Sequence, residues 1–256
     1  MFRIATWNVN SLRVRLPHVL QWLENENPDV LALQETKVTD NDFPVDVFHE
    51  AGYQVVFSGQ KTFNGVAIIS KSDPANISTG LPDFDDPQKR VLCADVNSVT
   101  VLNLYIPNGS EIGSEKYTYK LEWFSHLHPF VQDRLRDNRD VIILGDFNIA
   151  PEDQDVHDPA AWEGSVLVSE PERAEFRKLL ASGFADCFRL FEQEEESYSW
   201  WDYRAAAFRR NRGLRIDHIL ASQSLAPKCL NCQIDKSPRG LERPSDHVPV
   251  IAEFDL

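Results

Sequence analysis

The chain has 256 residues, a hydrophobic content of 42% and a formal net charge of −14, with 26 Lys and Arg against 40 Asp and Glu. That length suits one large domain or two small ones, and the apolar content is enough for a substantial core. The acidic total argues against a nonspecific polyanion binder but is compatible with a local basic cleft. No apolar run approaches the ~20 residues of a membrane span and no signal peptide is recognisable, so we expect no membrane association.

The predicted elements alternate along the chain without a linker or a repeat. In chain order the first half contains a strand, a helix capped by Ser11 with Pro17 in its first turns, and five further strands: Phe2–Trp7, the helix Ser11–Asn25, Val30–Gln34, Tyr53–Ser58, Gly65–Ser70, Val91–Asn97 and Val99–Tyr105. The second half contains a long amphipathic helical stretch with a break near Pro129, a strand, a helix ended by Gly183, and two strands: Gly113–Asn138, Val141–Leu144, Glu170–Ala181, Ile216–Ala221 and Val250–Phe254. Short turns such as Asn97-Ser98 favour antiparallel pairing, and the mixture of hairpins and helices predicts a two-layered sheet core with helices outside.

The four cysteines are too few for a disulfide framework, which favours a reducing cytoplasm. Cys229 and Cys232 form a C-x-x-C pair, but a zinc site would need a second pair nearby. We interpret them, like the isolated Cys93 and Cys187, as packing or surface thiols.

The fragment Gly145-Asp146-Phe147-Asn148 follows the four apolar residues Val141–Leu144. Residues i and i+2 of an extended segment point the same way, so the carboxylate of Asp146 and the amide of Asn148 converge where the strand stops. Layered proteins tend to place chemistry at such strand ends. A plain turn is the alternative interpretation.

Polar side chains also mark the ends of other predicted strands: Asn8, Asn10, Glu35, Tyr105, Asp217, Asp246 and His247. Each alone has an ordinary explanation as a turn former, a cap or an ion pair, such as Asp217 with Arg215, but together they predict one shared site. Magnesium prefers oxygen ligands of this kind and keeps several waters. A metal with His, Asp and Asn nearby suits attack on a phosphorus centre, where charge on phosphoryl oxygens must be stabilised.

The local charge reverses between Asp202 and Asp217, where five arginines and no acid occur beside Trp200, Trp201 and Phe208. Arginine next to aromatic residues is the chemistry of phosphate contact and of base or sugar stacking. The alternative is a charged helix face packed on a core. The arginines that we assign to nucleic-acid contact are Arg204, Arg209, Arg210 and Arg212.

Seven further motifs run in order along the chain: Thr6–Arg13, Leu33–Lys37, Gln60–Ala67, Asn103–Gly109, Gly145–Pro151, Arg215–Leu220 and Glu242–Pro249. Together they resemble the exonuclease III family of DNA-repair nucleases, within the endonuclease/exonuclease/phosphatase superfamily. The resemblance implies a four-layered α/β sandwich, two facing mixed sheets flanked by helices, as a single catalytic domain over residues 1–256. It places the active site in a cleft at one edge of the sheets.

The resemblance also implies a magnesium-dependent DNA phosphodiesterase, in which Mn2+ can take the place of Mg2+. Glu35 would be the principal metal ligand, with Asn8 and Asn10 lining the metal side and Asp246 in the outer sphere. Some relatives have an aspartate where this chain has Asn10, which leaves the number of metal sites open.

For the reaction itself, the resemblance gives Asp146 the task of orienting or deprotonating the attacking water, with help from Asn148. His247, held by Asp217, would contact the scissile phosphate, and Tyr105 would hydrogen-bond the phosphate or assist the leaving oxygen.

Trp200 and Leu214 would wall a pocket for a deoxyribose that lacks its base. The implied partner is double-stranded DNA with abasic sites, nicks or 3′ ends, cut by a cytoplasmic monomer. The sequence does not predict the relative strengths of abasic incision, 3′-end cleaning and 3′-to-5′ exonuclease action. These activities differ in the loops that grip the DNA and limit the pocket, here Asp153–Arg173 (with Trp162 and Leu167) and Trp200–Arg215.

Two other functions remain to be weighed. Superfamily relatives such as inositol-phosphate phosphatases, sphingomyelinases and pancreatic-type deoxyribonucleases usually place a histidine where this chain has Tyr105. A noncatalytic DNA-binding module would not need every catalytic position to be filled.

Overall fold

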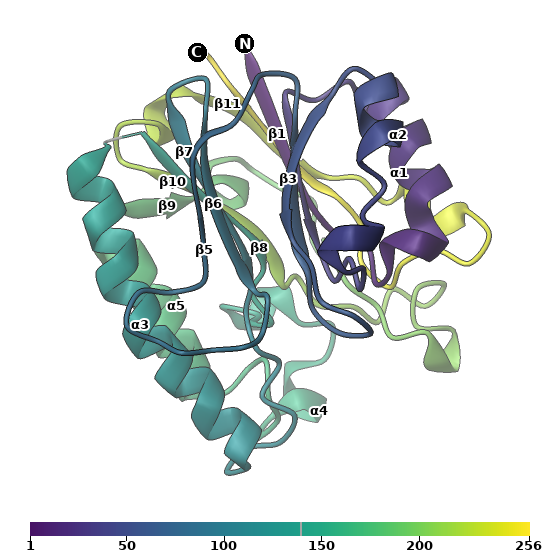
Figure 1. Ribbon diagram of the computed structural model, residues 1–256. Helices are drawn as coiled ribbons and strands as arrows, with labels where there is room; N and C mark the ends of the chain where they lie inside the picture. Colours follow the sequence, from purple (N-terminus) through teal and green to yellow (C-terminus); the bar gives the residue numbers. More distant parts are fainter. Residues whose placement is uncertain (139) are drawn as a thin grey trace.

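Two six-stranded sheets face each other and helices cover their outer faces, so the molecule has four layers (Figure 1). The computed structural model describes residues 1–138 and 140–256. The arrangement confirms the predicted α/β sandwich with two mixed sheets.

The first sheet has the strand order β11-β12-β1-β2-β4-β3, in which only β1 and β2 run parallel. Its strands are β1 (Phe2–Asn8), β2 (Val30–Gln34), β3 (Gln54–Ser58), β4 (Val66–Ser70), β11 (Cys229–Ile234) and β12 (Val250–Phe254). On its outer side lie α1 (Leu12–Glu26) and α2 (Val45–Glu50), at the right of Figure 1.

The second sheet has the order β5-β6-β7-β8-β10-β9, in which only β7 and β8 run parallel. Its strands are β5 (Ala75–Thr79), β6 (Val91–Val96), β7 (Val99–Tyr105), β8 (Val141–Asp146), β9 (Phe184–Asp186) and β10 (Asp217–Ser222). On its outer side lie α3 (Glu115–Asp137) and α5 (Glu170–Ala181), and α4 (Pro159–Trp162) precedes α5. Short 3-10 turns occupy Asp40–Asp42, Asp153–Asp155, Cys187–Leu190, Arg204–Ala206, Ala226–Lys228 and Ser237–Gly240.

Apolar side chains fill the spaces on both sides of each sheet. Ile4 and Ala32 of the first sheet meet Ile142 and Ile219 of the second in the central core. Because helices cover the outer faces as well, the central strands are buried on both faces, which explains their nearly continuous apolar runs.

The strand register aligns the polar strand ends at one edge of the two sheets. Asp146 at the end of β8 lies opposite Tyr105 on one side and opposite Asp217 on the other. In the first sheet, Asn8 lies opposite Gln34, the residue before Glu35. Polar residues that are far apart in the sequence therefore share one edge.

The predicted elements begin and end within two residues of the observed ones, and the turn at Asn97-Ser98 joins an antiparallel pair with positive φ at both residues (49° and 67°). The predicted break near Pro129 is wrong, because α3 continues through it. Leu127 on one side and Phe130 on the other are both buried against the second sheet, and this packing outweighs the hydrogen bond that proline cannot donate.

The sequence pattern does not predict β5, β9, β11, α2 or α4. These elements are short or lie at a sheet edge; every residue of β5 is exposed. The four cysteines are free and buried, in agreement with packing roles. Among the described residues, no helix has the length and apolar character that crossing a bilayer requires.

The two ends of the chain lie side by side at the top of Figure 1, where the Met1 ammonium donates to the carbonyl oxygen of Leu256 at 3.0 Å. β1 leads away from this point to Asn8, so the polar edge lies at the other end of the strand.

Candidate active site

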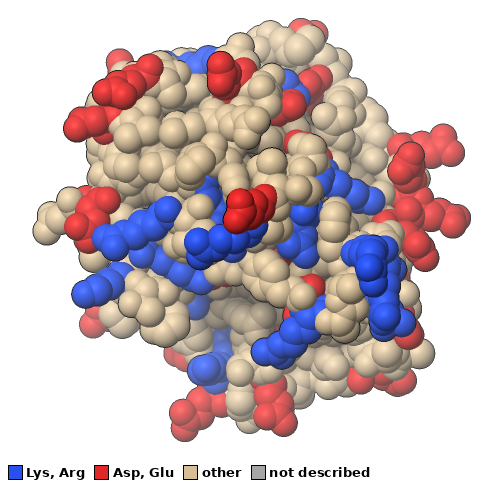
Figure 2. All heavy atoms as spheres, turned by 90° about the vertical axis from the view of Figure 1, so that its right-hand side faces the viewer, with Lys and Arg blue, Asp and Glu red and all other residues tan. Residues whose placement is uncertain are grey.

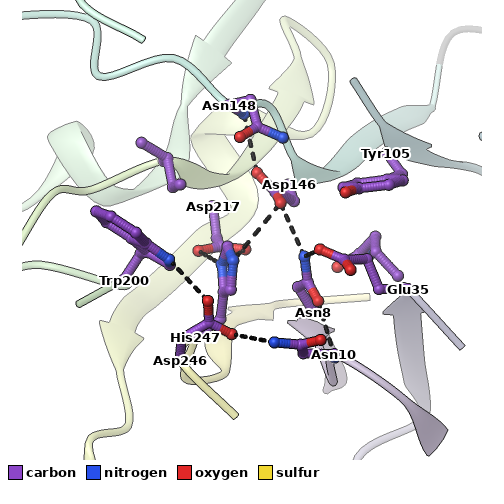
Figure 3. Close-up of polar contacts among 12 residues, drawn as sticks. Asn8, Asn10, Glu35, Tyr105, Asp146, Asn148, Trp200, Asp217, Asp246 and His247 are labelled. Atoms are coloured by element: carbon purple, nitrogen blue, oxygen red, sulfur yellow. Dashed lines mark hydrogen bonds and ion pairs between the residues drawn. The ribbon is translucent and has the colours of Figure 1, made fainter. Parts of the chain in front are cut away.

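The site residues predicted at strand ends meet at this edge, contributed by both sheets and by the loops that follow their strands (Figure 3). Those in the close-up are Asn8, Asn10, Glu35, Tyr105, Asp146, Asn148, Trp200, Asp217, Asp246 and His247.

Asp146 lies at the centre of the cluster and is buried. Its Oδ1 accepts the backbone N–H of Asn148 at 2.9 Å, and its Oδ2 accepts Nδ2–H of Asn8 at 2.9 Å. Burial, and the negative charges of Asp217 and Glu35, raise the pKa of Asp146 to about 7 despite the opposing effect of His247. Asp146 can therefore accept a proton near neutral pH.

The backbone around Asp146 needs a glycine before it. A Cβ at Gly145, whose φ is +144°, would lie 1.8 Å from the carbonyl oxygen of Leu104 on β7. Only glycine allows the two parallel strands to approach this closely here. The motif's glycine therefore serves the fold.

His247 is held from one side by Asp217. Its Nδ1 lies 2.9 and 3.1 Å from the two carboxylate oxygens of Asp217, and its Nε2 lies 3.7 Å from Oδ2 of Asp146. Burial lowers the pKa of His247, but Asp217 and Asp146 outweigh this effect and raise the pKa to about 10. The ring is thus an imidazolium at neutral pH. The proposed pairing of Asp217 with Arg215 is wrong.

Glu35 faces Asp146 across Asn8, whose Nδ2–H donates to both carboxylates, at 2.8 Å to Glu35. The ammonium of Lys37 lies 2.8 Å from Oε2 of Glu35 and 2.6 Å from Oδ1 of Asn10. The carboxylate of Glu35 and the side-chain amide oxygen of Asn10 thus both bind the Lys37 ammonium.

Asp246 connects the two sides of the site. Its Oδ1 accepts Nδ2–H of Asn10 at 2.9 Å and its Oδ2 accepts Nε1–H of Trp200 at 3.1 Å. Although burial alone would raise the pKa of Asp246, His247 and these two donors lower it, so the carboxyl is ionised.

Glu35, Asp146 and His247 could hold a metal ion, because one ligand atom of each lies within 4.8 Å of the others. The imidazolium of His247 cannot coordinate while it is protonated. The carboxylates of Glu35 and Asp146 remain, and such oxygen donors fit a hard divalent cation. The structure therefore contains a candidate metal site on the Glu35 side of Asp146.

Tyr105 lies beside Glu35 (Figure 3). Burial and the charges of Glu35 and Asp146 raise the pKa of its phenol well above the usual value. The guanidinium of Arg90 lies 4.6 Å above the ring and donates to the Tyr105 carbonyl oxygen at 3.0 Å. The phenol therefore keeps its proton and can act as a hydrogen-bond donor.

An apolar wall lies on the other side of His247. The Trp200 ring is 6.5 Å from the His247 ring and 6.4 Å from Trp162, against which it packs edge-on at 84°. Leu214 and Leu167 are buried in the same cluster. The residues predicted for an apolar sugar pocket thus lie together, next to the imidazolium.

The basic segment between Asp202 and Asp217 contains exposed arginines and one buried arginine. Arg204, Arg209, Arg210 and Arg212 are exposed, whereas Arg215 is buried and pairs with Asp155 at 2.6 Å. The segment forms no helix beyond the turn Arg204–Ala206, so the helical part of the alternative is wrong, whereas Phe208 packs on Trp201 as that alternative expected. Figure 2, which shows the right-hand side of Figure 1 from the front, has Lys and Arg side chains in a band across the face, with Asp and Glu mostly around it.

The sequence pattern of the Endonuclease/Exonuclease/phosphatase family matches residues 5–247. The chain belongs to this family. It is 38% identical to the exodeoxyribonuclease III of Haemophilus influenzae over 98% of this chain and 99% of that protein. This confirms the resemblance to exonuclease III drawn from the motifs.

Solved structures of family members match the whole chain. A 3′ phosphatase, NExo, from Neisseria, bound to a product DNA hairpin, has 47% identity and a TM-score of 0.98, with 100% of both chains covered. An AP endonuclease from Archaeoglobus fulgidus has 43% identity and a TM-score of 0.96, also with 100% of both chains covered. The chain is thus a member of a nuclease family of hydrolases.

Three cations that contact the site residues were assigned no role from the sequence: Lys37, Arg90 and Lys120. Lys120 is fully buried and donates to the carbonyl oxygen of Asn148 at 2.7 Å. A signal for it exists in the sequence, because Tyr117, Lys120, Phe124 and Leu127 repeat at the spacing of one helix face. A lysine within an apolar stripe indicates a buried partner.

Proposed function

We propose that this chain is a magnesium-dependent DNA phosphodiesterase of base excision repair. It would incise DNA at abasic sites, clean blocked 3′ ends and remove nucleotides from 3′ ends. The observation that carries the proposal is a carboxylate and an imidazolium, Asp146 and His247, 3.7 Å apart beside the acidic side chain of Glu35 and the apolar wall of Trp200. The relatives that are an exodeoxyribonuclease III, a 3′ phosphatase and an AP endonuclease support it.

Glu35 would hold the metal, with Asn8 and Asn10 lining that side and Asp246 in the outer sphere through Asn10. Oxygen donors favour Mg2+, and Mn2+ can take its place. When bound, the ion supplies positive charge to the phosphate oxygens. The donors already surround the ammonium of Lys37, which supports a cation there.

Asp146 would hold the attacking water and accept its proton, because burial keeps the pKa of this carboxyl near neutrality. Asn148 fixes the carboxylate through its backbone N–H and helps to orient the water. A small loss of rate in the Asp146→Asn variant, which lacks the proton acceptor, would mean instead that Asp146 only orients the water.

His247 would donate a hydrogen bond from Nε2 to a phosphate oxygen, since its Nδ1 is already bound by Asp217. A fixed cation aimed at the phosphate stabilises the charge that grows during in-line displacement. Tyr105, with its proton retained, would donate to the phosphate or to the leaving oxygen.

Trp200 and Leu214, together with Trp162 and Leu167, would form the apolar wall that accepts a deoxyribose without its base. Arg204, Arg209, Arg210 and Arg212 would contact backbone phosphates of double-stranded DNA.

We further propose that residues 1–256 form one catalytic domain that acts as a monomer in the cytoplasm. The site draws on both sheets, from Asn8 to His247, which supports a single unit. Four free thiols suit a reducing compartment.

The test is a side-by-side assay on three duplexes: one with an internal abasic analogue, one with a nicked 3′-phosphate and one with a recessed normal 3′ end. We expect cleavage with Mg2+ or Mn2+, none in EDTA, and recovery when metal is added back. If no duplex is cut with either metal, the proposal fails.

A further inference from the structure

Three consecutive carbonyl oxygens after β8 each accept a hydrogen bond from a side chain of a different element. The carbonyl of Asn148 accepts from Lys120 of α3 at 2.7 Å, and that of Ala150 accepts from Arg173 of α5 at 3.1 Å. The carbonyl oxygen of Ile149 lies 2.9 Å from Nε2 of His218 on β10. Because this segment belongs to no helix or strand, side chains satisfy its backbone groups and fix its path.

Of the three side chains that bind these carbonyl oxygens, Lys120 is a cation that is completely buried. Its ammonium has three donors and finds three acceptors: the carbonyl oxygens of Asn148 at 2.7 Å and Asn108 at 3.3 Å, and Oε1 of Glu172 at 2.5 Å. A buried charge is tolerated only when it is fully paired in this way. The three bonds define one position for the ammonium.

Glu172 fixes the other end of the pair. It also accepts the backbone N–H of Leu167 at 3.1 Å and both the N–H and the hydroxyl of Ser169, at 3.1 and 2.6 Å. The pair therefore connects the beginning of α5 and the loop that carries Leu167 to the segment that carries Asn148.

The two carbonyls that Lys120 holds belong to residues that contact each other, since Nδ2–H of Asn108 donates to Oδ1 of Asn148 at 2.9 Å. Asn148 has a φ of +50°, a conformation outside the ordinary helix and strand regions, and its N–H donates to Asp146. A shift of the Asn148 peptide would therefore move a donor away from the Asp146 carboxylate.

We propose that Lys120, anchored by Glu172, is a positioning residue for the reaction: it holds the backbone of Asn148 and Asn108 so that Asp146 faces the attacking water. It acts through Asn148 and does not touch the substrate. The inference rests on the proposed function for its effect on catalysis, whereas its effect on the Asn148 backbone is independent of that function.

The test is the paired substitution Lys120→Met/Glu172→Gln, which removes both charges and leaves no isolated buried ion. We expect the single-turnover rate on the abasic duplex to fall by about 10- to 100-fold, because small misplacements of reacting groups have effects of this size. The Kd for DNA should stay unchanged, and the Asn148 amide should exchange its hydrogen faster by NMR. Glu172→Gln alone keeps the side-chain shape but leaves the buried Lys120 ammonium without its counter-charge, so it should move both quantities in the same direction and also lower the stability.

The matched control is Leu127→Ala, which removes buried packing from the same helix and none of the hydrogen bonds of Lys120. It should lower the melting temperature without slowing cleavage or Asn148 exchange. If the paired variant and Glu172→Gln both cleave and exchange like this control, the positioning role is overturned. If wild type cleaves no duplex, the proposed function fails, and the exchange rates still decide whether Lys120 fixes Asn148.

Discussion

Nε2 of His247 lies 3.7 Å from Oδ2 of Asp146, and the two atoms belong to groups of opposite charge. The separation is too long for a hydrogen bond, so each group keeps a free bonding direction toward a third molecule. A water on the carboxylate and a phosphate oxygen on the imidazolium would satisfy both. Substitutions of Asp146 and of His247 should therefore affect cleavage in different ways.

Asp146→Asn should slow cleavage by about 10²- to 10⁴-fold, because the amide has nearly the same shape but cannot accept the water's proton. DNA binding should persist, since the phosphate contacts are unaffected. Single-turnover rates and fluorescence anisotropy separate the two effects, and a variant with wild-type turnover would refute the role. His247→Ala should also slow cleavage, and the double variant should lose less than the product of the two effects.

The stability of the metal-free protein should depend on pH through His247, whose pKa is raised from 6.5 to about 10. A raised pKa means that the protonated ring stabilises the fold fully below about pH 6.5. That contribution is lost as the pH rises from 6.5 to about 10. Urea denaturation should therefore show the free-energy difference between wild type and His247→Gln shrinking over this interval. A difference that stays constant would contradict the assigned charge.

Two substitutions of Trp200 separate its ring from its hydrogen bond to Asp246. Trp200→Phe loses the hydrogen bond but keeps an aromatic wall, so the preference for an abasic site over an intact nucleotide should remain. Trp200→Ala loses both, and the preference should fall by about 10-fold or more, which is the scale of losing one large apolar contact. Ratios of kcat/KM on matched duplexes measure this. If the two variants have the same ratio of kcat/KM on the abasic duplex to that on the intact duplex, the Trp200 ring does not form the pocket wall.

Arg209→Ala/Arg210→Ala should weaken DNA binding and reduce the slope of log K against log salt by about 2, if each guanidinium neutralises one phosphate. Arg177→Ala is the control, since Arg177 is an exposed cation on α5 in an ion pair with Glu170. Binding isotherms at several salt concentrations give the slopes. An unchanged slope in the double variant would mean that the basic segment is structural.

The sequence predicts the elements that carry long apolar runs, and therefore the central strands and the three long helices. It also predicts the residues at the ends of those strands. Each polar side chain alone has an ordinary explanation, and the prediction comes from their repeated occurrence at the ends of buried strands. β5 escapes prediction because an exposed edge strand has no apolar run, and its pairing with β6 is a property of the sheet. α3 is continuous at Pro129 because of packing that no local pattern reports.

The site residues that escape prediction act through contacts made only in the folded chain. Arg90 is defined by its position over Tyr105, and Lys120 by acceptors that lie 12, 28 and 52 residues away. The sequence suggests an ion pair of Arg215 with Asp217, but in the folded chain the partners of Arg215 are Asp155 and Asp186. Charge in the sequence does not distinguish a surface contact from a buried pair.

The hydrogen bond between Met1 and Leu256 closes the chain at the end of the sheets that lies away from Asp146. A short flexible linker could therefore join residues 1 and 256 into a circular permutant, with new ends opened in an exposed turn such as Asn97-Ser98. The same geometry makes either end suitable for attachment to a surface or for fusion to a second enzyme. In an attached or fused protein, the polar edge around Asp146 would face away from the attachment point.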